Sequence, residues 1–158
     1  MSEARIRRAT PGDRDAAVAL WLALHREHEA LDARYRLAPD AALLWGNDVA
    51  EWTREDGHLV LLADADGGAV GLLSAHLGHP IPVYAPALFA HVDDLYVRPP
   101  WRGRGLGQQM LEEAERWARR EGADHLQAGV LALNEGGQAF WSSAGTAPYS
   151  VLVTKPLR

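Results

Sequence analysis

The sequence predicts one α/β domain over residues 1–158, in which helices flank a mixed, mostly antiparallel sheet. Two apolar runs of strand length are joined by turn residues at positions 64–68, which is typical of an antiparallel hairpin. Further along, a strand, an amphipathic helix and another strand follow in succession, which indicates a parallel pair. No internal repeat, low-complexity tract or linker divides the chain, so we expect a single core.

The elements are expected in the order strand, helix, helix, three strands, helix, strand, helix, strand. Hydrophobic periodicity, turn residues and helix caps place them at residues 4–9, 15–31, 40–54, 58–63, 69–77, 91–97, 105–121, 125–133, 138–144 and 150–154. Asp40 is the candidate N-cap of the second helix, and Gly122 ends the third helix as a C-cap would.

A short basic loop rich in glycine joins strand 91–97 to helix 105–121. Pro99-Pro100 ends the strand, and Arg102-Gly103-Arg104-Gly105-Leu106-Gly107-Gln108 follows. Glycines permit close backbone approach, and the free N–H groups at a helix N-terminus carry about half a positive charge. The loop is therefore an anion site, and phosphate is the usual anion.

Other glycine motifs fit this loop less well. It lacks the Gly-x-Gly-x-x-Gly spacing of a dinucleotide fold, and no Gly-Lys-Ser/Thr follows as in a P-loop. An RNA-binding arginine–glycine segment would be repeated and disordered, whereas this one occurs once between ordered elements.

Composition narrows the classes of function. The formal net charge of −5 argues against nucleic acid bound through a basic surface. No apolar run reaches the length of a membrane span, and residues 1–8 lack the apolar core of a signal peptide, so we expect a cytoplasmic protein without a membrane partner. The absence of cysteine excludes disulfides and thiolate chemistry, and the histidines show no metal-binding spacing, so no metal is expected.

Two blocks of sequence resemble the Gcn5-related N-acetyltransferases (GNAT). Residues 102–107 match that family's Arg/Gln-x-x-Gly-x-Gly/Ala signature, between a strand ending Asp-Leu-Tyr-Val and an amphipathic helix. A strand followed by Asn134, Ala139, Phe140, an aromatic residue and Gly145 is similar to a second family block. The order of elements agrees over nearly the whole chain, so the resemblance implies an acyl-CoA N-acyltransferase (GNAT-like) fold.

The resemblance also implies where acetyl-CoA, the acetyl donor, binds. Its pantetheine arm lies where strands 91–97 and 125–131 separate, and its pyrophosphate lies on the amides of Gly103 to Gln108. The donor-binding residues expected on this basis are Leu95, Tyr96, Val97, Arg102, Gly103, Arg104, Gly105, Leu106, Gly107, Gln108, Asn134 and Trp141.

Asp93 and Asp94 are the candidate catalytic residues. At pH 7 an alkylamine is mostly protonated, and freeing its lone pair costs about 4 kcal/mol. A carboxylate can accept that proton, directly or through water, and attract the cation. Because adjacent strand residues face opposite sides, we expect only one of the two to face the cleft; the resemblance favours Asp93.

Trp141 departs from the resemblance, because many family members carry at this position a tyrosine that protonates the departing CoA thiolate. Indole cannot do this, so the thiolate either leaves without a dedicated acid or uses another hydroxyl. The candidates for that hydroxyl are Tyr84, Tyr149 and Ser142. Thr146 also replaces the usual phenylalanine after Gly145.

The acceptor is not identified by the sequence. His28, Glu29, Tyr35 and Tyr84 are the candidate substrate-binding residues, because the resemblance places them where substrate enters. The first hypothesis is an N-acetyltransferase acting on a primary amine of a small molecule or peptide. The alternatives are an acyl-CoA-binding regulatory module without turnover and a structural dimer partner of the same fold. A homodimer through a C-terminal strand is a further expectation.

Overall fold

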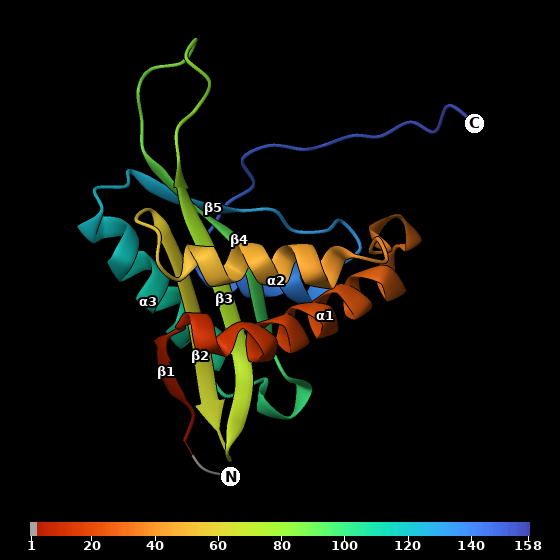
Figure 1. Ribbon diagram of the computed structural model, residues 1–158. Coiled ribbons are helices and arrows are strands. Elements are labelled where there is room, and N and C mark those ends of the chain that lie inside the picture. Colours follow the sequence, from red (N-terminus) through yellow and green to blue (C-terminus); the bar gives the residue numbers. More distant parts are fainter. Residues whose placement is uncertain (1–2) are drawn as a thin grey trace.

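The computed structural model describes residues 3–158 and is built on a five-stranded sheet in the order β1-β2-β3-β4-β5 (Figure 1). Neighbouring strands from β1 to β4 are antiparallel, and β4 pairs with β5 in parallel. The strands are β1 (Arg5–Arg8), β2 (His58–Ala65), β3 (Gly68–Gly78), β4 (Phe89–Val97) and β5 (His125–Ala128). The predicted mixed, mostly antiparallel sheet is confirmed.

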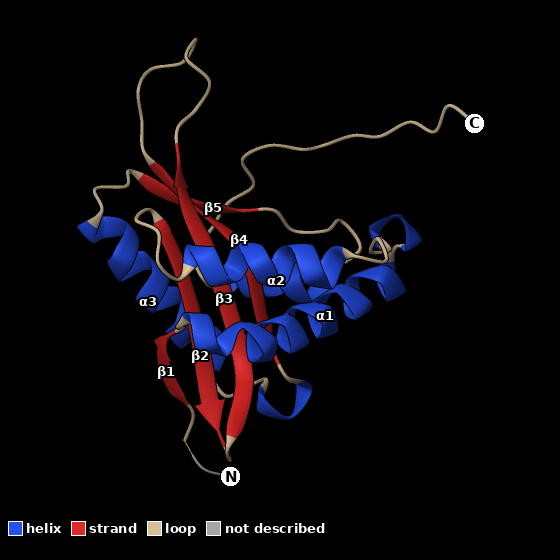
Figure 2. Cartoon of the chain, in the orientation of Figure 1, coloured by secondary structure: helices blue, strands red, loops and turns tan. Residues whose placement is uncertain are grey.

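Helices cover both faces of this sheet (Figure 2). The α-helices are α1 (Arg14–Leu31), α2 (Ala41–Trp52), α3 (Leu106–Arg120) and α4 (Glu135–Ser143). The short 3-10 helices are η1 (Pro11–Asp13), η2 (Ala33–Tyr35) and η3 (Pro99–Trp101). Helices α1 and α2 pack on one face, here called the α1/α2 face, and α3 packs on the other, the α3 face. No helix in the described residues is long and apolar enough to cross a membrane.

Helix α3 shows how its sequence pattern becomes packing. The six apolar positions of its periodic stripe are all buried against the sheet: Leu106, Met110, Leu111, Ala114, Trp117 and Ala118. Gly105 is the N-cap of the helix and Gly122 follows its end, both with a positive φ, of 80° and 82°. Gly122 ends the helix as expected, one residue after the C-cap Glu121, because the left-handed region is open to glycine without steric cost.

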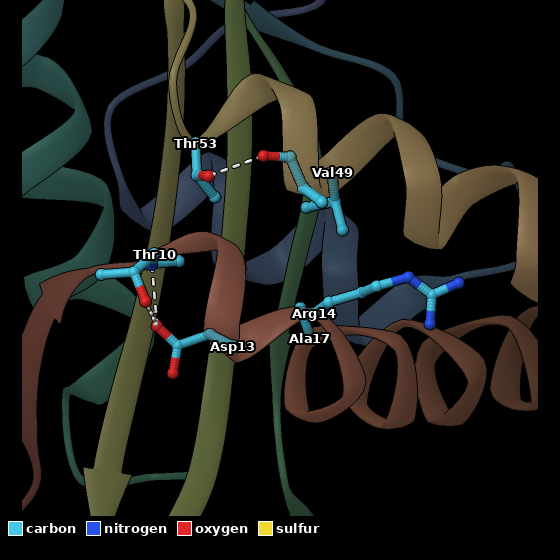
Figure 3. Close-up of a pocket in the computed structure, with 8 residues that line it drawn as sticks. Thr10, Asp13, Arg14, Ala17, Val49 and Thr53 are labelled. Carbon is cyan, nitrogen blue, oxygen red and sulfur yellow. Dashed lines mark hydrogen bonds between the residues drawn. The ribbon is translucent and has the colours of Figure 1, made fainter.

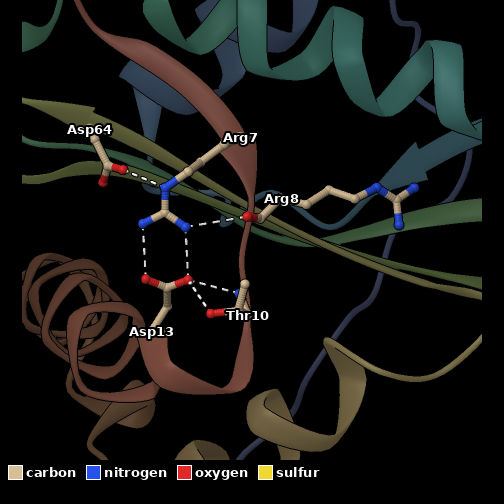
Figure 4. A network of polar contacts seen from close by, with 5 residues as sticks. All are labelled: Arg7, Arg8, Thr10, Asp13 and Asp64. Carbon is tan, nitrogen blue, oxygen red and sulfur yellow. Dashed lines mark hydrogen bonds and ion pairs between the residues drawn. The ribbon is translucent and has the colours of Figure 1, made fainter.

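A network of charges holds the N-terminal edge of the sheet (Figure 4). The Arg7 guanidinium on β1 donates two hydrogen bonds to Asp13, of 2.8 and 2.9 Å, and a third to Asp64 on β2. Thr10 also donates to Asp13 from its backbone N–H. These contacts hold the pKa of Asp13 well below its usual range, with the Arg7 hydrogen bonds as the largest cause. They join β1, β2 and the start of α1.

The boundaries of several predicted elements were wrong. The hairpin turn is only Asp66 and Gly67, both with positive φ, because a two-residue turn of this kind matches the twist of the strands. Asp40 stands at the N-cap of α2, but its side chain makes no capping hydrogen bond. Helix α4 begins at Glu135 rather than at 138, because the Asn134 side chain accepts a hydrogen bond from the Gly137 N–H and so caps it.

Two strand predictions failed for lack of a neighbouring strand. The run expected at 125–133 is a strand only as far as Ala128, where its pairing with β4 stops. The strand expected at 150–154 is absent, and Val151, Leu152 and Val153 are more than 80% exposed. β propensity alone provides no partner for the backbone hydrogen bonds that define a strand.

Candidate active site

The edges of β4 and β5 separate at Asp93. The two strands pair from Phe89 and His125 to Val92 and Ala128, and no further pair follows in the described residues. On the other side of β4, Ala75 is opposite Val92 and Ser74 is opposite Asp94, so Asp93 is an unopposed bulge residue. The backbone from residues 93 to 97 therefore keeps one hydrogen-bonding edge open toward β5, where an extended ligand could add as a strand does.

The glycine loop beside this edge has free backbone donors. No backbone N–H from Gly103 to Gln108 donates to a backbone carbonyl in the described chain, and the first such bond runs from Gln109 to Gly105. Gly103 and Gly105 have φ of 72° and 80°, and a Cβ at either would meet nothing within 4 Å. Unpaired N–H groups at the start of α3 are the arrangement on which the expectation of an anion site rests.

The two loop arginines make contacts with the protein itself. The Arg102 guanidinium donates to the Val97 carbonyl (2.7 Å) and to Glu27 on α1 (2.7 Å), and lies 5.3 Å from the centre of the Tyr96 ring. The Arg104 guanidinium lies 5.7 Å from the centre of the Trp101 ring. Arg102 thus joins the end of β4 to α1.

The remaining predicted donor residues surround this edge from both faces. Leu95 and Val97 pack with the core of the α3 face, whereas Tyr96 is buried with α1. Trp141 packs edge-on against Phe140, with ring centres 5.4 Å apart. A Cβ at Gly107 would lie 3.3 Å from the Phe140 ring, so this glycine allows α4 to pack closely on the start of α3.

Asp94 is buried on the α1/α2 face, at 8% exposure. The Ser74 hydroxyl donates to it at 2.6 Å, and the His25 Nε2 lies 3.9 Å away. Burial raises the pKa of Asp94 to about 6, against the opposing effect of the Ser74 hydrogen bond. Burial likewise lowers the pKa of His25 to about 4, so this ring is neutral at pH 7.

Asp93 lies on the same face and is more exposed. Its Oδ2 is 2.7 Å from Nδ1 of His76, and its Oδ1 is 4.0 Å from Nε2 of His91. His76 and Ser74 lie two residues apart on β3, so they share the α1/α2 face, and so do the carboxylates that contact them. The alternation of faces expected for adjacent strand residues fails here, because the bulge at Asp93 places both aspartates on one face.

A continuous row of aromatic and histidine rings extends across this face, here called the ring row. Consecutive ring centres lie 4.3 to 6.3 Å apart. In order of contact its members are Tyr35, His28, His25, Trp21, Trp45, Trp52, His58, His76 and His91. The row joins the predicted substrate residues Tyr35 and His28 to the neighbourhood of Asp93 and Asp94.

The other two predicted substrate residues stand apart. Glu29 is exposed on α1 and makes no ion pair within residues 3–158. Tyr84 is 66% exposed in the loop between β3 and β4. The structure does not bring either one into contact with the ring row.

Two surface pockets lie elsewhere. The crevice in Figure 3, lined among others by Thr10, Arg14 and Val49, has no interior space for a water molecule. A pocket of about 140 Å³ lies between β1 and α3, beside Arg8 and Arg120. Neither includes a residue of β4 or the glycine loop. Within the described chain, no group of three or more His, Cys, Asp or Glu residues could hold a metal ion.

Known proteins resemble this chain in sequence and in architecture. Residues 18–145 match the acetyltransferase (GNAT) family. The chain belongs to this family. An aminoglycoside N(6')-acetyltransferase type 1 of Stenotrophomonas maltophilia is 29% identical over 126 residues, which cover 77% of this chain and 71% of that protein.

Solved structures show the same fold. A variant of the BH1408 protein from Bacillus halodurans superimposes with a TM-score of 0.87 at 20% identity, over 98% of this chain and 99% of its own. The aminoglycoside N-acetyltransferase AAC(6')-Iy in complex with CoA superimposes with a TM-score of 0.76 at 19% identity, over 100% of this chain and 97% of its own. The protein is thus an acetyl-CoA-dependent acetyltransferase of the GNAT type, as the resemblance implied.

Sequence reasoning missed Ser74, His76 and His91 as members of the site. His76 and His91 are paired across β3 and β4, a register that neither segment reveals alone. The sequence does contain one signal for this site. Ser74 and His76 are polar, lie two residues apart in the otherwise apolar β3, and therefore share one face of the sheet.

Proposed function

We propose that this enzyme transfers the acetyl group of acetyl-CoA to a primary amine of a small molecule or peptide, directly and in a ternary complex. The observation that supports this most strongly is the position of Asp93, a partly exposed carboxylate at the bulge where β4 and β5 separate. A carboxylate at this place draws a protonated amine to the end of the open strand edge.

The donor binds along that edge in this proposal. The free amides of Gly103 to Gln108 hold the pyrophosphate, and the open backbone of Leu95 to Val97 holds the pantetheine arm. Asn134 and Trp141 contact the donor from α4. A backbone N–H of β4 polarises the thioester carbonyl, since an oriented N–H stabilises the developing oxyanion.

The two aspartates have different tasks in this proposal. Asp93 drives deprotonation of the acceptor, which costs about 4 kcal/mol for an alkylamine at pH 7. Asp94 is buried and accepts a hydrogen bond from Ser74, so it ties β4 to β3 and adds negative charge beneath the ring row. His28, Glu29, Tyr35 and Tyr84 are proposed to contact the acceptor.

The test is thiol release from acetyl-CoA over a panel of amines. Because the relative of 29% identity is named for aminoglycosides, the panel begins with these and continues with simple diamines and peptide N-termini. Amine-dependent thiol release, with acetylation of the amine seen by mass spectrometry, is the expected result. Failure of the protein to bind acetyl-CoA in calorimetry would overturn the proposal.

Trp141 favours a second candidate, a module that binds acyl-CoA without turnover. Its indole cannot protonate a thiolate, and the three alternative hydroxyls, of Tyr84, Ser142 and Tyr149, are all exposed. Binding of acetyl-CoA without thiol release for any amine of the panel would favour this candidate.

A further inference from the structure

We infer that His76 is the proton acceptor for the incoming amine, and that Asp93 acts by orienting the His76 ring. This inference rests on the proposed function and refines how the amine loses its proton. It assigns a catalytic task to a β3 histidine that the sequence pattern does not single out.

The hydrogen bond between the two residues fixes the tautomer of His76. An ionised carboxylate can only accept, so the 2.7 Å contact with Asp93 Oδ2 requires the proton of the neutral ring to be on Nδ1. The lone pair is then on Nε2, which has no hydrogen-bond partner within residues 3–158. The His76 side chain is 38% exposed, so that lone pair is open to a ligand. An aspartate orienting a histidine in this way is a recurrent device in proton transfer.

His91, the other ring beside Asp93, is excluded from the same task by its own partner. The amide nitrogen of Gln127 on β5 lies 3.1 Å from His91 Nδ1, and an amide nitrogen can only donate. The lone pair of His91 is therefore occupied, and its Nε2 carries the proton, 4.0 Å from Asp93 Oδ1. Asp93 is thus hydrogen-bonded to His76 and faces the His91 N–H at 4.0 Å, and of the two rings His76 alone presents a free lone pair.

The position of His76 matches the task. Its partner Asp93 is the bulge residue at which β4 and β5 separate, so the pair stands at the end of the open strand edge. Its ring also belongs to the ring row, at 6.3 Å from His58 and 5.4 Å from His91. An amine bound along the ring row would meet Nε2 of His76 next to that open edge.

The proton balance of the step closes. Nε2 of His76 takes one proton from the ammonium, which frees the lone pair to attack the thioester carbon. The C–N bond forms and the C–S bond breaks, and the second proton of the attacking nitrogen passes to the thiolate, which leaves as the CoA thiol. His76 then returns its proton to solvent. No dedicated acid at position 141 is required.

His76→Asn tests the inference. The asparagine side-chain nitrogen can keep the N–H that bonds to Asp93, while the lone pair of Nε2 is lost. We expect kcat to fall by about 100-fold or more, with the Kd for acetyl-CoA unchanged. The matched control is His79→Asn, because the His79 ring bonds to the Ala87 carbonyl rather than to a carboxylate. It should keep wild-type turnover.

Two further measurements separate a catalytic ring from a structural one. Added imidazole should restore thiol release to His76→Ala and not to Asp93→Asn. Nitrogen NMR of the wild-type protein should find His76 with its proton on Nδ1, whatever the acceptor. The inference is overturned if the wild type is active and the kcat of His76→Asn lies within about threefold of it. It is also overturned if NMR finds the His76 proton on Nε2. Failure of the wild type itself to release thiol would instead overturn the proposed function, and the inference with it.

Discussion

The two faces of the sheet are built from alternate residues of the same strands, yet they differ sharply in chemistry. On the α3 face, Leu59, Leu73 and Val92 are apolar and buried in one cluster. The neighbouring positions on the α1/α2 face include Ser74 and Asp94, which are buried and polar. Because adjacent residues of a strand face opposite sides of the sheet, one residue can pack in the core while the next one lies in the site.

This division predicts its largest effect at Leu73, a fully buried residue of the α3 face. Leu73→Ala should lower the free energy of unfolding by about 2–5 kcal/mol, because it leaves a cavity that the core cannot fill. Urea denaturation measures the loss, and thiol release per folded molecule should stay close to wild type.

The adjacent Ser74→Ala is the matched variant on the other face. It should cost about 1–3 kcal/mol, because Asp94 loses a buried hydrogen bond, and it should also lower turnover. Equal thiol release by Leu73→Ala and Ser74→Ala would contradict the view that one face serves stability and the other catalysis.

Asp94 predicts a pH dependence of stability. Its pKa is raised to about 6 in the folded state, so between pH 4 and 6 the folded protein binds more protons than the unfolded chain. This group therefore stabilises the fold below pH 4 relative to pH above 6, by about 3 kcal/mol. Burial of His25 has the opposite sign, since its pKa is lowered to about 4 and stability is lost as the pH falls through this range.

The two effects oppose each other in the wild type. Asp94→Asn removes one of them, so its stability should rise with pH between 4 and 6 more steeply than that of the wild type. Melting temperatures across this range give the comparison. Parallel curves for the two proteins would show that Asp94 is already ionised without cost in the fold.

Asp13 predicts a smaller effect, confined to stability. Asp13→Ala should cost about 1–2 kcal/mol, because it removes the partner of Arg7 and the cap of the turn before α1. The network is partly exposed, so its ion pairs are screened. Chemical denaturation measures this loss. A fall in kcat of more than threefold would show that the Arg7–Asp13 network also affects catalysis and is not structural alone.

The sequence predicted the local structure of the glycine loop and α3 better than the arrangement of side chains around Asp93, for a physical reason. The glycine loop and α3 are contiguous, so their spacing, periodicity and caps are all readable locally. The site around Asp93 depends on a β-bulge and on the register between β3 and β4, which bring His76 and His91 to one carboxylate. Register is set by the whole sheet, so neither histidine was predicted. The failed strand at 150–154 has the same cause, since it has no neighbour to pair with.

The most direct test of the donor site compares the two glycines that flank α3. Gly105 at the start of α3 and Gly122 after its end have nearly the same φ, 80° and 82°, and a Cβ added at either would meet no atom within 4 Å. Alanine at either should cost a similar stability, about 1 kcal/mol. In calorimetry with acetyl-CoA, Gly105→Ala should weaken the Kd by at least about tenfold and Gly122→Ala should leave it unchanged. Equal Kd values for the two variants and the wild type would contradict the assignment of the loop as the donor site.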